Sequence, residues 1–125
     1  MKIAISTTDQ NLNAAFDPRF GRAAYFCIFD TDSGATTYTP NPALGVSGGA
    51  GVQAAQFIAD QGVDAVISGS FGPNAFKTLQ AAKIAAYLAP AEDKLRATDL
   101  LERYRAGQLK QATAPSHAGH HGGGH

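Results

Sequence analysis

The segment F-D-P-R-F-G-R, from Phe16 to Arg22, carries side chains well suited to binding an anion. Arg19 and Arg22 flank Phe20 and Gly21. A guanidinium group stays positively charged at any physiological pH and offers a fixed fork of hydrogen-bond donors. No set of catalytic side chains accompanies the two arginines. The segment therefore predicts anion capture rather than bond breaking.

A plainer interpretation of the same segment is structural. One or both arginines would then pair with Asp17, with Asp30 or with the C-terminus of a helix, because surface ion pairs at such spacing are common. Gly21 would be required only for a backbone with positive φ. The sequence leaves both interpretations open.

Two glycine-rich segments, S-G-G-A-G (Ser47 to Gly51) and S-G-S-F-G-P-N (Ser68 to Asn74), each open a predicted helix. Free backbone N–H groups at the start of a helix attract anions. Neither segment is a phosphate-binding P-loop or a dinucleotide-binding G-x-G-x-x-G motif, and both could simply be flexible connections. If the three segments converge, they form an anion site whose candidate ligands are Arg19, Phe20, Gly21, Arg22, Gly48, Gly49, Gly51, Gly69, Gly72 and Asn74.

All four histidines of the chain fall within its last nine positions, at His117, His120, His121 and His125. Neutral imidazoles suit nickel, copper, zinc or iron, and the intervening glycines would let the segment wrap around an ion. A cloning remnant is the alternative, but an uninterrupted six-histidine run is absent. We favour a native, weak and exchangeable metal-binding tail.

The cysteine and the carboxylates do not form a catalytic or cluster-binding set. Cys27 is the single cysteine, so ligation of an iron–sulfur cluster by cysteines alone would need other subunits. It lies between Phe26 and Ile28, where a free cysteine usually behaves as a small buried apolar side chain. The first predicted strand has no carboxylate, which disfavours two-metal nuclease chemistry.

Composition indicates a small globular domain without a basic or membrane-spanning character. The chain has 125 residues, 44% of them hydrophobic, and its ten Lys+Arg balance ten Asp+Glu. This balance favours neither nucleic acid nor anionic lipid as a partner. No apolar run approaches the roughly 20 residues that span a bilayer. We expect a cytoplasmic protein with one domain over residues 1–107 and a disordered Gly/His-rich tail over residues 108–125.

The elements that must position these loops follow the predicted order β-β-β-α-β-α-β-α. This order indicates an α/β fold with a mixed five-stranded sheet flanked by helices, of the ribonuclease-H-like class. Ligands of such sheets collect at the carboxyl ends of parallel strands. Hydrophobic periodicity predicts strands at Ile3 to Ser6, Ala23 to Asp30, Ala35 to Thr39, Val63 to Ser68 and Ile84 to Leu88, and helices that end at Gly62, begin at Pro73 and span Glu92 to Ala106.

Three segments together resemble the dinitrogenase iron–molybdenum cofactor biosynthesis family: K-I-A-I-S, F-D-P-R-F-G-R-A-A-Y-F-C-I-F-D and G-V-D-A-V-I-S-G-S-F-G-P-N-A-F-K-T-L. The resemblance covers about residues 1–105. It implies a ribonuclease-H-like fold and a metallocluster-binding role, since the family includes carriers of nitrogenase cofactor precursors and proteins that bind a molybdenum–copper sulfide cluster. Nitrogenase-associated members often have a histidine where this chain has Arg19, so the chain is more similar to the stand-alone branch.

The first hypothesis is therefore a non-enzymatic carrier of an anionic metal–sulfur cluster, of the Fe–Mo–S or Mo–Cu–S type. It would exchange the cluster with donor and acceptor proteins, as a monomer or as a weak homodimer paired through the strand near Thr36 to Thr39. The alternatives are a metal-storage module acting through the histidine tail and an enzyme acting on a phosphorylated ligand. The second alternative lacks an evident base or nucleophile.

Overall fold

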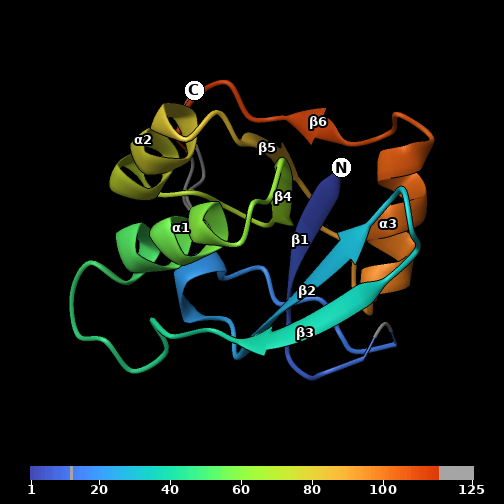
Figure 1. Ribbon diagram of the computed structural model, residues 1–125, viewed down its shortest axis with the longest axis horizontal. Helices are drawn as coiled ribbons and strands as arrows, with labels where there is room; N and C mark the ends of the chain where they lie inside the picture. Colours follow the sequence, from blue (N-terminus) through green and yellow to red (C-terminus); the bar gives the residue numbers. More distant parts are fainter. Residues whose placement is uncertain (12, 116–125) are drawn as a thin grey trace.

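A computed structural model of the chain describes residues 1–11 and 13–115. Over these residues the fold is mixed α/β, with a six-stranded sheet and three α-helices (Figure 1). None of the helices there is long and apolar enough to cross a membrane. The elements in chain order are β1 (Lys2–Thr7), a 3-10 helix η1 (Phe20–Arg22), β2 (Tyr25–Asp30), β3 (Thr36–Pro40), α1 (Ala50–Asp60), β4 (Ala65–Ser68), α2 (Pro73–Ala81), β5 (Ala85–Leu88), α3 (Ala97–Arg105) and β6 (Lys110–Gln111).

The strands lie in the order β3-β2-β1-β4-β5-β6. β1, β4 and β5 are parallel to one another, whereas β2 is antiparallel to both of its neighbours, β1 and β3. β3 therefore runs in the same direction as β4. Because α1 follows β3 and α2 follows β4, both helices begin at the same edge of the sheet, where the parallel strands end.

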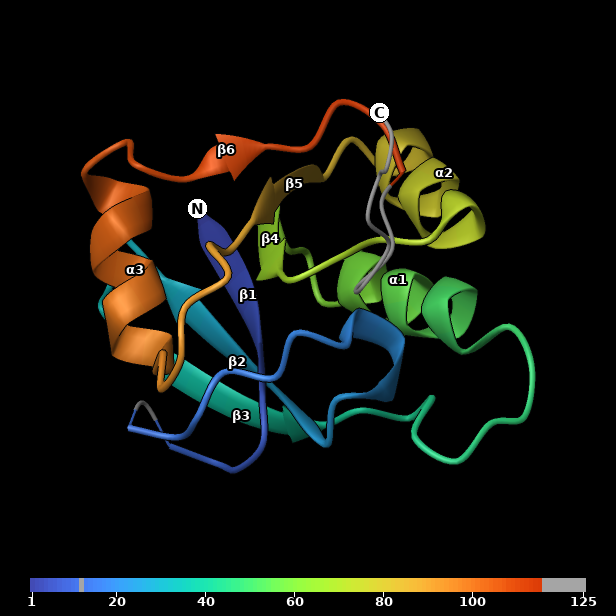
Figure 2. The ribbon, with the colours of Figure 1, turned by 180° about the vertical axis from the view of Figure 1, so that it is seen from behind.

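Helices cover both faces of the sheet, as Figures 1 and 2 show from opposite sides. β2 alternates its side chains between the two faces, and both sets are buried. Phe26 and Ile28 pack with α1 and α2, while Phe29 packs with α3. β2 is therefore buried on both faces, as expected for a strand inside the sheet.

α1 and α3 each end two residues before a glycine, as predicted, but α3 begins later than predicted. Gly62 and Gly107 have φ of 73° and 71°, the left-handed conformation that commonly ends a helix. α3 starts at Ala97 rather than at Glu92, because the preceding residues form a loop in which Lys94 has φ of 62°. Glu92, which lies in this loop, pairs with Arg103 on α3.

A sixth strand follows Gly107, in the segment that we expected to be disordered. Lys110 and Gln111 form β6, which pairs antiparallel with Leu88 and Tyr87 of β5. The next residue, Ala112, is buried, and its N–H donates to the carbonyl of Ala86. The five-stranded sheet was therefore one strand short, because two exposed polar residues carry no recognisable strand pattern. The rest of the predicted tail, residues 116–125, lies outside the described residues.

Candidate functional site

A cavity of about 500 Å³ lies where the arginine segment and the two glycine-rich loops meet. The three segments follow three different strands, β1, β3 and β4, so the sequence could only suggest that they converge. The structure places residues of all three around one cavity. Its lining consists of Arg19, Phe20, Gly21, Arg22, Gly49, Ala50, Gly51, Val52, Ser70, Gly72, Pro73, Asn74 and Ala75.

Close backbone packing brings these segments together. A Cβ atom on Gly21 would lie 2.8 Å from the backbone nitrogen of Gly51, so η1 can approach the first turn of α1 only through a glycine. Gly51 in turn faces α2, where its own Cβ would lie 3.1 Å from the Cβ of Ala75. Gly21 is not among the glycines with positive φ. Its conformational freedom is therefore not the reason for the glycine, as one interpretation had it.

Two helix N-termini face this cavity without a capping side chain. The cap of α1 is Gly49, which has φ of 71°, and the cap of α2 is Gly72; neither helix has a side-chain cap bond or an acidic residue in its first turn. The N–H groups of a first turn have no partner within their own helix, and the helix dipole adds a partial positive charge there. The lining therefore offers backbone donors to an anion from two sides.

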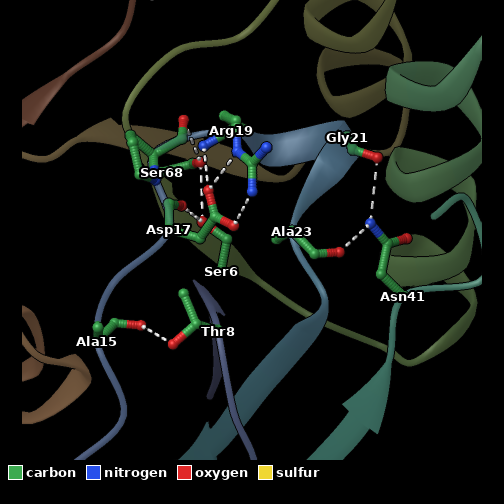
Figure 3. Close-up of polar contacts among 10 residues, drawn as sticks. Ser6, Thr8, Ala15, Asp17, Arg19, Gly21, Ala23, Asn41 and Ser68 are labelled. Carbon is green, nitrogen blue, oxygen red and sulfur yellow. Dashed lines mark hydrogen bonds and ion pairs between the residues drawn. The ribbon is translucent and has the colours of Figure 1, made fainter. Parts of the chain in front are cut away.

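Arg19 lines the cavity but is also paired with a buried carboxylate. Its Nε donates to Oδ1 of Asp17 at 3.0 Å and its Nη2 to Oδ2 at 2.9 Å (Figure 3). The hydrogen bond with Asp17 and the charge of that carboxylate raise the pKa of Arg19, so the guanidinium stays charged. The structure confirms the pairing of Arg19 with Asp17. Anion binding by Arg19, the other interpretation, stays a prediction, although the residue lines the cavity.

Arg22 is held differently. Its Nη1 donates to the carbonyl of Val46 at 3.1 Å, in the loop before α1. Over residues 1–11 and 13–115, Arg22 makes no ion pair. Its positive charge is therefore uncompensated at the cavity, unlike that of Arg19.

A buried polar network fixes the segment that carries Arg19. The hydroxyl of Ser6, at the end of β1, donates to the backbone carbonyl of Asp17 at 2.6 Å and lies 2.9 Å from the hydroxyl of Ser68 at the end of β4. Ser68 also donates to the carbonyl of Pro18. Figure 3 shows these side chains gathered beneath Arg19. The ends of two parallel strands therefore determine where Arg19 lies.

Asn41 holds the other end of η1. This buried side chain donates from its amide to the carbonyls of Gly21 and Ala23 and accepts from the N–H of Ala43. Sequence reasoning did not single it out, although an asparagine between two prolines directly after a predicted strand is a usable signal for a turn. Asn41 thereby fixes η1 against the loop that leads to α1.

Three predicted ligands have a structural role or lie elsewhere. Phe20 is buried and its ring packs against Phe26 and Phe71, although the residue borders the cavity. Gly69 is absent from the lining; it allows close approach to Pro18, whose Cβ would lie 2.5 Å from an added Cβ. Gly48 is also absent from the lining. Sequence reasoning did not name five further lining residues, four of which are apolar and carry no sign of anion binding: Ala50, Val52, Ser70, Pro73 and Ala75.

No group of three or more histidine, cysteine, aspartate or glutamate side chains suited to a metal ion occurs in the described part of the chain. Cys27 is fully buried in β2, where burial raises the pKa of its thiol to about 11. It therefore behaves as the structural residue that we expected. The proposed metal ligands His117, His120, His121 and His125 lie outside the described residues.

Comparison with known proteins places these features in a family. The family model described as dinitrogenase iron-molybdenum cofactor matches residues 1–107. The apo form of the orange protein from Desulfovibrio gigas is 37% identical, with a TM-score of 0.86 over 93% of this chain and 96% of that one. A Thermotoga protein named for NifB and assigned to the DUF35 family is 28% identical, with a TM-score of 0.79 over 93% and 97%. A search of curated proteins gave no match.

The family match extends from the first residue through the end of α3 and so includes every segment that lines the cavity. The alignment with each of the two structures covers nearly the whole length of the other protein, so the likeness extends well beyond a shared motif. The chain belongs to the dinitrogenase iron-molybdenum cofactor family.

Proposed function

We propose that this protein is a non-enzymatic carrier or scaffold for an anionic metal–sulfur cluster, or its precursor, of the iron–molybdenum or molybdenum–copper sulfide type. One observation carries the proposal: Arg22 and the uncapped first turns of α1 and α2 converge on a single cavity of about 500 Å³. Backbone N–H groups and guanidinium groups are suited to the sulfide surface of such an anion.

The chemistry of the lining also supports a carrier rather than a catalyst. Among the described residues, the lining of the cavity includes no carboxylate, histidine or thiol, and so no titratable base that could activate the hydroxyl of Ser70. A cluster held there would bring its own sulfide ligands, and the protein would contribute hydrogen bonds and charge. General acid–base or nucleophilic catalysis needs a titratable or nucleophilic group within reach of the ligand.

The finer features of the proposal concern the setting of the carrier. We place it in the cytoplasm, as a monomer or a weak homodimer that exchanges its cargo with donor and acceptor proteins. The strand order β3-β2-β1-β4-β5, with β2 antiparallel to its neighbours, supports the ribonuclease-H-like class for the sheet.

Reconstitution with a coloured thiometallate tests the proposal. The apoprotein is titrated with tetrathiomolybdate, with and without copper(I), and the visible charge-transfer absorption is followed. Arg22→Gln should weaken binding by about five- to tenfold, as expected for one charge a few ångströms from an anion near the surface. Arg105→Gln is the matched control, because it removes the same charge from α3, where Arg105 lies over the ring of Phe29.

Equal weakening by the two variants would mean that only net charge matters and would count against the cavity as the site. Failure of the wild-type protein to bind thiometallate under anaerobic conditions would refute the carrier role itself. Binding by the wild-type protein that is weakened in Arg22→Gln but not in Arg105→Gln supports the proposal.

The metal-storage alternative depends on His117, His120, His121 and His125. A chain truncated after Pro115 lacks all four histidines but keeps every described residue of the cavity. Under the carrier proposal this chain binds tetrathiomolybdate as the full chain does, while its affinity for nickel or zinc falls. Loss of thiometallate binding on truncation would instead favour the tail as the functional part.

A further inference from the structure

Within residues 1–11 and 13–115, the side chain of Asp17 bonds only to Arg19. Its carboxylate accepts from the backbone N–H of Arg19 as well as from Nε and Nη2, so both oxygens bond to one residue. The contacts of residue 17 with Ser6 use backbone atoms: its N–H donates to the Ser6 carbonyl and its own carbonyl accepts from the Ser6 hydroxyl. Apart from its hydrogen bond with the Arg19 N–H, the carboxylate is therefore separable from the network that fixes the loop.

The two members of this pair differ in their exposure to water. The side chain of Asp17 is 3% exposed, whereas that of Arg19 is 63% exposed. Water and salt screen an exposed charge more than a buried one. Water therefore weakens the attraction between Arg19 and an anion in the cavity. The Asp17 carboxylate, which is poorly screened, opposes that attraction further.

The ion pair itself is a weak source of stability. Arg19 is exposed to solvent, which screens its attraction to Asp17, while burial of the Asp17 carboxylate costs desolvation energy. A carrier, by contrast, must release its cargo, and a site with two uncompensated arginines and two helix N-termini would hold a multiply charged anion tightly. Asp17 leaves only Arg22 uncompensated among the arginines of the cavity.

We propose that Asp17 is the residue that limits the affinity of this site: its buried carboxylate holds one edge of Arg19 and offsets its charge, so that an anionic metal–sulfur cargo binds reversibly. The inference rests on the proposed carrier function. It also assigns Arg19 a set orientation, because the Nε–Nη2 edge is occupied by Asp17. Within the described part of the chain Nη1 makes no hydrogen bond, which leaves it available to a ligand.

The test compares the wild-type protein with Asp17→Asn. Asparagine keeps an oxygen that can accept from the N–H of Arg19 but removes the negative charge. Asp17→Asn should bind tetrathiomolybdate about tenfold more tightly at low salt, with slower release to a chelator and a steeper loss of affinity as salt rises. Adding Arg19→Gln to this variant should abolish the gain, because the uncovered charge is that of Arg19.

Asp60→Asn is the matched control. It removes the same negative charge from the last residue of α1, the end opposite to the one that lines the cavity, and should change the affinity little. Circular dichroism and urea unfolding establish that each variant is folded. If Asp17→Asn does not fold, Asp17→Ser, which is also neutral and can accept the same backbone hydrogen bond, takes its place.

The possible results separate the two proposals. If the wild-type protein binds and the folded Asp17 variant binds equally or more weakly, the inference is overturned while the carrier function stands. If neither protein binds thiometallate, the carrier function fails and the inference fails with it. A gain of equal size in Asp60→Asn would show a general effect of net charge and would also overturn the inference.

Discussion

At the scale of single residues, Cys27 shows how burial determines chemistry. It lies in β2 between its sheet partners Ile5 and Tyr38 and is inaccessible to solvent. Burial disfavours the thiolate, which raises the pKa of the thiol from 9.0 to about 11. The thiol of Cys27, the single cysteine of the chain, is therefore neither a nucleophile nor a cluster ligand at neutral pH.

The raised pKa of Cys27 predicts a loss of stability in alkali. Below pH 9 both the folded and the unfolded chain keep the proton, and this residue adds no pH dependence. Between pH 9 and pH 11 the unfolded chain loses the proton first, so the free energy of unfolding should fall by about 2 kcal/mol on account of this thiol. Urea unfolding at pH 8 and pH 11 measures the fall.

Cys27→Ala provides the comparison, because other groups also titrate in this range. The variant should be less stable than the wild-type protein at pH 8, as a small core truncation is, and should lose less stability between pH 8 and pH 11. Identical losses in the two proteins would contradict a buried, protonated thiol.

The two arginines mark how far residue-level reasoning reached. Sequence reasoning named Arg19 and Arg22 as candidate anion ligands and Asp17 as a possible counter-charge, and the structure brings both arginines to the cavity. The sequence could not show that only one arginine is paired, since both lie in the same seven-residue segment. The difference arises from burial of Asp17 against the ends of β1 and β4, which are remote in sequence.

At the scale of elements, the contact between η1 and α1 depends on one missing side chain. Gly21→Ala would bring a Cβ within 2.8 Å of Gly51 N and 3.1 Å of the Ala50 carbonyl carbon, and these are backbone atoms that cannot rotate away. We expect destabilisation by about 1–3 kcal/mol, typical of overpacking, together with weaker thiometallate binding as the cavity wall shifts. Urea unfolding and the visible titration measure the two effects.

Gly48→Ala is the control for this prediction. Gly48 belongs to the same loop system, but no atom lies within 4 Å of an added Cβ and its φ is not positive. The substitution should change stability by no more than about 0.5 kcal/mol. If Gly21→Ala proved as harmless as Gly48→Ala, the close approach of η1 to α1 would not be a requirement of the site.

Element boundaries could be predicted where local chemistry fixes them. Pro73 at the start of α2 and Gly62 after α1 act within a turn of the chain, and both assignments hold. The start of α3 could not be predicted in this way. Glu92 and Arg96 have helical spacing, yet Glu92 makes a two-bond contact with Arg103 across the loop, an arrangement that depends on the position of α3 against the sheet.

At the scale of the whole molecule, a strand that the sequence did not predict pairs with β5 and forms that edge of the sheet. β6 has two residues, Lys110 and Gln111, and both are exposed. Its stability comes from pairing with β5 and from Ala112, which reaches the core that lies under α1 and α2. Such a strand forms because an edge is available, not because its own residues favour it.

Two truncations test whether β6 belongs to the folding unit. Ending the chain after Gly107 removes β6 together with the buried Ala112 and its hydrogen bond to the Ala86 carbonyl. The loss of these few sheet bonds should lower the free energy of unfolding by about 1–3 kcal/mol. It should also expose the edge of β5 to pairing between molecules, visible as association on size-exclusion chromatography.

Ending the chain after Pro115 retains all of these contacts and should leave both measurements unchanged. Equal stability of the two truncated chains would mean that the sheet is complete at β5 and that the family match, which ends at residue 107, also marks the end of the cooperative domain.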